Sequence, residues 1–99
     1  MKRDLSKRES RIITRGEVSG HSHIIIGECE IEDVDGETII HTKEGCAIKH
    51  LIESQFVEQG VEVHTKEHGD IPLQDNTSYH YIQQREYDPF EDKVRKVVD

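Results

Sequence analysis

The sequence is short of the residues that build large apolar cores. Its 99 residues include no tryptophan, two phenylalanines and one methionine. Hydrophobic residues make up 32% of the chain and charged residues 34%, so the core of the fold must be small. The apolar residues nevertheless occur in clear runs, which favours a compact fold over a disordered chain.

Long hydrophobic segments and cysteine motifs are also lacking. No stretch approaches the roughly 18 apolar residues that a membrane-spanning helix needs, and no apolar core of a secretory signal peptide occurs at the N-terminus. The two cysteines, Cys29 and Cys46, are too far apart for a C-x-x-C redox or zinc motif. We therefore expect a cytoplasmic protein with reduced thiols and no membrane partner. One bridge between neighbouring strands is conceivable, but nothing in the sequence requires it.

The sequence also lacks an excess of basic residues. The net charge is −8, with 21 acidic and 13 basic residues, which argues against a general surface for DNA or anionic membranes. The exception is the N-terminal stretch MKRDLSKRESR, which is rich in lysine and arginine. We predict a flexible basic arm over residues 1–10, the one part through which nucleic acid could be contacted. Residues 11–99 are predicted to form a single β-rich domain.

Alternation of apolar and polar residues predicts mainly strands. The Asp35-Gly36 pair is a strong signal for a tight hairpin turn, because both residues tolerate a positive φ. It should join the long strand before it to a strand near residues 37–43. The other expected strands are RIITRGEV at 11–18, HSHIIIGECEIE at 21–32, VEVHT at 61–65 and TSYHYIQQREY at 77–87.

One segment has helical spacing. Apolar residues recur every three or four positions over about 46–58, and Gly60 is a plausible stop. For residues 89–98 two interpretations stay open, a helix that begins at Pro89 and a final strand. The fold class predicted is therefore mainly β: a small antiparallel β-sandwich or open barrel with one short helix.

Seven histidines are the most unusual feature of the composition. His21 and His23 are two apart on a predicted strand, so both rings leave the same face, which suits two ligands of one metal ion. His64 and His68 are a second candidate pair, able to reach the first only if their strands are neighbours. His41 and His50 are interpreted as ordinary exposed or half-buried residues.

The stretch from His21 to Glu28 resembles the first motif of the cupin superfamily, H-x-H-x4-E. The resemblance implies that His21, His23 and Glu28 are ligands of a divalent metal ion. On a regular strand Glu28 points away from the histidines, because five positions separate it from His23. A bulge at Gly27 would turn Glu28 inward.

A wider resemblance involves the run GHSH, the EHG that contains His68, and QREY at 84–87. This combination is similar to a group of small proteins from bacteria and their phages. The resemblance implies a microbial or phage origin and no particular activity.

Together these patterns predict a small divalent-metal-binding β-domain, cupin-like, with zinc, nickel, manganese or iron as the metal. The expected ligands are the two histidine pairs and Glu28, and no residue is assigned a catalytic role. The alternative is a non-catalytic protein-interaction module, an inhibitor, adaptor or accessory protein with an acidic surface. The partner is an unknown small molecule or protein, and a homo-oligomer is compatible with the sequence.

Overall fold

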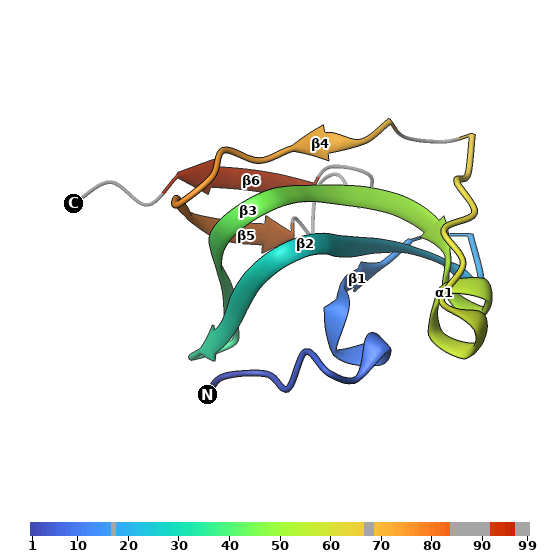
Figure 1. The fold of residues 1–99 in the computed structure, drawn as a ribbon, viewed down its shortest axis with the longest axis horizontal. Coiled ribbons are helices and arrows are strands. Elements are labelled where there is room, and N and C mark those ends of the chain that lie inside the picture. The colour runs from blue at the N-terminus through green and yellow to red at the C-terminus, as the bar shows by residue number, and fades with distance from the viewer. Residues whose placement is uncertain (17, 67–68, 84–91, 97–99) are drawn as a thin grey trace.

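The computed structural model describes residues 1–16, 18–66, 69–83 and 92–96 of the chain. A short 3-10 helix, η1, opens the fold, and five strands form one antiparallel sheet in the order β1-β2-β3-β5-β6, with the two-residue β4 also paired to β3 (Figure 1). The elements are η1 Arg8–Arg11, β1 Ile12–Arg15, β2 His21–Val34, β3 Glu37–Ile52, α1 Glu53–Gln59, β4 Ile71–Pro72, β5 Ser78–Gln83 and β6 Asp92–Lys96.

The predicted fold class is confirmed: the protein is mainly β and antiparallel, with one short α-helix. Among the described strands, β1 and β6 end the sheet without pairing to each other, so the sheet is open. The long β2–β3 hairpin is its centre, and Figure 1 shows both strands as curved neighbours. Its turn is the predicted one, with φ of 50° at Asp35 and 79° at Gly36, the left-handed pair that matches strand twist.

The register of this hairpin changes along its length. Near the turn, Ile31 lies opposite Ile40, whereas farther away Ile25 lies opposite Ile48. Uninterrupted counting from the turn would place Ile25 opposite Cys46. Two register shifts close together therefore displace β3 by two residues in all. An even displacement leaves the side chains of both strands on their original faces.

Gly27 lies where the register shifts. Its φ is 105°, and a Cβ there would lie 2.4 Å from the Gly45 carbonyl oxygen, so only glycine fits this close approach. The extra residues lie on β3, and β2 keeps its alternation through the irregularity. Accordingly Cys29 and Ile31 stay with the main core cluster, and Glu28 is exposed.

Both faces of the hairpin are covered by apolar packing. Neighbours in sequence, Ile24 and Ile25, are both fully buried, and they belong to different clusters. This explains why the isoleucine run 24–26 is apolar without alternation. The larger cluster comprises Ile25, Ile31, Ile40, Cys46, Ile48, Leu73, Tyr79 and Tyr81. The smaller one comprises Ile12, Ile24, Leu51 and Phe56.

The helix is shorter than the sequence pattern indicates. Residues 46–52 of the predicted helix belong to β3, and α1 covers only Glu53–Gln59. The first half of the segment also fits period two, since Cys46, Ile48 and His50 are all buried, and pairing to β2 favours the strand. The stop at Gly60 is confirmed: it has φ of 68° and its amide donates to the Phe56 carbonyl.

The other predicted strands are shorter in the structure than the sequence pattern indicates. The first is limited to β1, and the strand at 77–87 to β5, with residues 84–87 outside the described part. The segment 61–65 forms only an isolated bridge, between His64 and Leu51. In the C-terminal segment, residues 92–96 form β6, which favours the strand interpretation.

The sequence predicts a flexible arm over residues 1–10, and in the structure residues 1–3 of this segment lie along the outer edge of β2. The Arg3 amide donates to the Ile31 carbonyl at 2.9 Å, and the Asp33 amide donates to the Met1 carbonyl at 2.8 Å. Figure 1 shows this segment, in dark blue, running beside the lower end of β2. Within the described part of the chain, neither helix has the length and apolar character to cross a membrane.

Candidate functional site

Three histidines meet at the end of the hairpin remote from its turn. His23 on β2 pairs directly with His50 on β3, and His21 lies diagonally across from His50 on the same face. The ring centroids of His23 and His50 are 4.6 Å apart. Those of His21 and His50 are 5.8 Å apart, with nearly perpendicular planes. These three residues are called the histidine cluster below.

His50 is the buried member of the cluster, with 1% of its surface exposed. Its Nδ1 is hydrogen-bonded to the Thr65 hydroxyl, and the Thr65 amide donates to the His50 carbonyl at 3.0 Å. Its Nε2 faces Gly16, where an added Cβ would lie only 3.0 Å away. The ring orientation is therefore set by Thr65 on one side and by the backbone of Gly16 on the other.

An open pocket of about 370 Å³ adjoins the cluster at His21. Glu53 lies in its wall and accepts a hydrogen bond from the Ser22 hydroxyl at 2.7 Å. The same carboxylate oxygen lies 3.0 Å from Nε of Arg15. The pocket is lined by Arg15, Gly16, Ser19, Gly20, His21, Ser22 and Glu53, so its walls offer one cation, one carboxylate and two hydroxyls beside an imidazole.

The other candidate ligands from the sequence are not in this cluster. Glu28 is exposed and lies opposite Glu44, beyond the register shift. His64 bridges to Leu51, so it points to the face opposite His50, and its Nε2 is 3.1 Å from Asp70 Oδ1. His68 lies outside the described residues.

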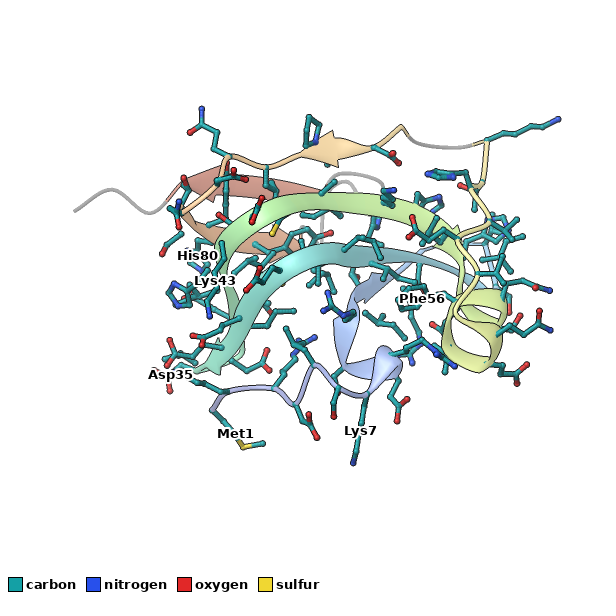
Figure 2. The ribbon with its side chains drawn as sticks, viewed as in Figure 1. Met1, Lys7, Asp35, Lys43, Phe56 and His80 are labelled. Atoms are coloured by element: carbon teal, nitrogen blue, oxygen red, sulfur yellow. The ribbon has the colours of Figure 1, made fainter. Side chains whose placement is uncertain are left out.

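Two further histidines lie near the β2–β3 turn, far from the cluster. His41 Nδ1 is 2.7 Å from the Ser78 hydroxyl, and its Nε2 is 3.6 Å from a Glu32 carboxylate oxygen. His80 Nε2 is 3.0 Å from a carboxylate oxygen of Glu37, and Figure 2 shows His80 at the turn end of the sheet. All three partners of these rings are polar side chains at least partly open to solvent, so we assign His41 and His80 a structural role.

The ring separations in the cluster are close to those of a metal site. Two imidazoles bound to one tetrahedral ion place their centroids about 5 Å apart, between the two separations observed here. Among the described residues, however, no three or more His, Cys, Asp or Glu side chains are arranged to hold a metal ion.

His50 is the member that sequence reasoning missed. Residues 46–52 fit helical spacing, and in a helix His50 would have no strand partner. The signal that points to it is the Asp35-Gly36 turn: even-numbered residues of the returning strand pair with odd-numbered residues of β2. That rule places His50 on the face of His21 and His23.

Comparisons with family models, with curated proteins and with solved structures find no match to this chain.

Proposed function

We propose that this protein is a small divalent-metal-binding β-domain whose ligands are His21, His23 and His50. The observation that carries the proposal is the pairing of His23 with His50, which gathers three imidazoles on one face of a rigid hairpin. Imidazole nitrogen suits zinc, nickel and iron better than manganese. The proposal keeps both histidines of the cupin-like motif and replaces Glu28 with His50 as the third ligand.

The surroundings of His50 support a ligand role. Metal-binding histidines commonly have their second ring nitrogen hydrogen-bonded, which orients the ring and selects the tautomer. Here Thr65 bonds Nδ1, so in this proposal His50 would bind the metal through Nε2. Burial of the ring limits the rotamers it can adopt, which lowers the entropy lost on binding.

Three protein ligands leave a coordination position for water or a small molecule. The pocket that His21 lines would give such a molecule access to the ion. A bound ion there would polarise a carbonyl group or lower the pKa of a water molecule. The partner in this proposal is accordingly a small molecule that enters the pocket. Composition and the resemblance stated above favour a cytoplasmic protein of bacterial or phage origin.

Metal titration tests the proposal. Zn²⁺ or Ni²⁺ should bind wild-type protein with one ion per chain and raise the melting temperature, because the ion binds the folded state preferentially. His21→Asn and His23→Asn should each weaken binding by about tenfold or more. His80→Asn is the matched control, since it removes one imidazole outside the cluster. Calorimetry and Co²⁺ absorption measure affinity and coordination number.

Two results would contradict this function. One is equal weakening by His23→Asn and His80→Asn, which would indicate loose binding by surface histidines. The other is the absence of any metal-dependent change in folded wild-type protein. Either outcome favours the interaction module, in which the net charge of −8 attracts a basic protein partner.

A further inference from the structure

The two cysteines meet where the hairpin register shifts. The Cys46 thiol donates to the Glu28 carbonyl oxygen at 3.0 Å, and that carbonyl is bonded to the nitrogen of Cys29. Because a carbonyl oxygen lies about 3 Å from the next Cα, the Cys46 sulfur is within about 6 Å of the Cys29 Cα. Both thiols are free in this structure.

Packing places the two side chains on one side of the hairpin. Cys46 is buried in the larger core cluster, and Cys29 packs against that same cluster. The strands also approach closely here, since a Cβ on Gly27 would lie 2.7 Å from the Cys46 Cα. The ladder is interrupted on both sides of Glu28, so a small adjustment at this point disturbs little regular pairing.

We propose that Cys29 and Cys46 form a dithiol modification site, which a small disulfide such as oxidised glutathione converts into a bridge between β2 and β3. In the first step the Cys29 thiolate attacks the glutathione disulfide, forms a mixed disulfide and releases one glutathione thiolate. The Cys46 thiolate then attacks the Cys29 sulfur and releases the second glutathione. The protein loses two protons and two electrons, and one oxidised glutathione becomes two reduced molecules.

Exposure sets the order of these steps. Cys29 is half-buried and Cys46 is 4% exposed, so the external disulfide meets Cys29 first. Burial raises the pKa of the Cys29 thiol and the neighbouring Cys46 thiol raises it further, while the charge of Arg11 acts in the opposite direction without reversing the shift. Little thiolate therefore exists at neutral pH, so the exchange is slow there and accelerates as the pH rises.

The test is oxidation of the full chain, treated with a metal chelator, by oxidised glutathione. We expect a monomeric product lighter by two hydrogens, in which one peptide pair joins Cys29 to Cys46 after digestion. Its rate of formation should rise about tenfold per pH unit while the thiol form predominates. Its melting temperature should exceed that of the reduced protein by about 5 °C or more, because the bridge lowers the conformational entropy of the unfolded chain.

Two variants serve as controls. Cys29→Ser should form no bridge, and Cys46→Ala should stop at a glutathione adduct on Cys29. Since Cys46 is in the core, circular dichroism must first show that the Cys46→Ala variant is folded. The mass and peptide map of the wild-type protein test the bridge without this variant. Three wild-type results would overturn the proposal: a lasting Cys29 adduct, a disulfide-linked dimer, or two thiols that remain open to alkylation.

Discussion

At the residue scale, glycines act in two different ways in this hairpin. Gly27 and Gly36 both have positive φ, 105° and 79°, which L-residues with side chains adopt at a cost. Around Gly36 an added Cβ would meet nothing within 4 Å, whereas at Gly27 it would meet the backbone of Gly45 at 2.4 Å. Glycine is therefore required at position 36 only for the backbone conformation. At position 27 it is required also for the close contact between the two strands.

Substitution by alanine separates these two effects. Gly36→Ala should lower the free energy of unfolding by about 1 kcal/mol, the cost of the left-handed conformation. Gly27→Ala should lower it by at least about 3 kcal/mol, because backbone on β3 must move as well. Urea unfolding measures both values. Equal losses would show that the close approach at Gly27 contributes nothing to stability.

At the element scale, α1 depends on its surroundings. Seven residues are too few for an independently stable helix. Phe56 is its buried residue and packs in the smaller cluster, on the side of α1 that faces the sheet (Figure 2). Arg8 of η1 adds hydrogen bonds to the carbonyls of Val57 and Glu58, at 3.0 and 3.2 Å. Tertiary contacts, rather than helix propensity, hold this element.

Removing the Phe56 ring should therefore release the helix. We expect Phe56→Ala to lower the free energy of unfolding by about 3–4 kcal/mol and to speed hydrogen exchange of the α1 amides. Gln59→Ala, at an exposed position of the same helix, should change stability by less than about 0.5 kcal/mol. If the α1 amides of Phe56→Ala remain as protected as in the wild type, the helix has another anchor.

At the scale of the whole molecule, the N-terminal segment closes the outer edge of β2. Residues 1–3 lie beside one end of the strand and β1 beside the other. Between them Arg11 donates to the carbonyls of Ile25 and Gly27, at 3.2 and 3.1 Å. An open edge would invite pairing with another chain. Arg11 and the first residues of the chain therefore form contacts within the fold.

The Arg3–Asp33 pair links this segment to the hairpin and makes stability depend on pH. Arg3 donates to both carboxylate oxygens of Asp33, at 2.7 and 2.9 Å. These hydrogen bonds hold the pKa of Asp33 below its ordinary value of 3.8. A depressed pKa stabilises the fold fully above the unfolded value, and this contribution is lost as the pH falls through the folded value.

Unfolding experiments between about pH 2 and 6 check that dependence. The pair is partly exposed, so we expect Asp33→Asn to lower stability near pH 6 by only about 1 kcal/mol. The difference from wild type should shrink as the pH drops below 3.8. Arg3→Gln should remove most of the same effect. A difference that stays constant down to pH 2 would mean that the carboxylate charge is not involved.

Local patterns determined much of this fold. The Asp35-Gly36 turn, the alternation in β2 and the stop at Gly60 are encoded in neighbouring residues, and each is present in the structure. The same patterns place His21 and His23 on one face. They misassign residues 46–52, because an apolar segment with mixed spacing satisfies both periods and only a partner strand decides between them.

The sequence by itself thus determined a β-rich chain with two histidines at the start of its longest strand. Only the tertiary structure decided that His50 is their neighbour, that Glu28 is not, and that Cys46 approaches Cys29. The physical reason is register. Contacts across the hairpin depend on the two-residue displacement near Gly27 and Gly45, where two backbones that are distant in sequence approach closely.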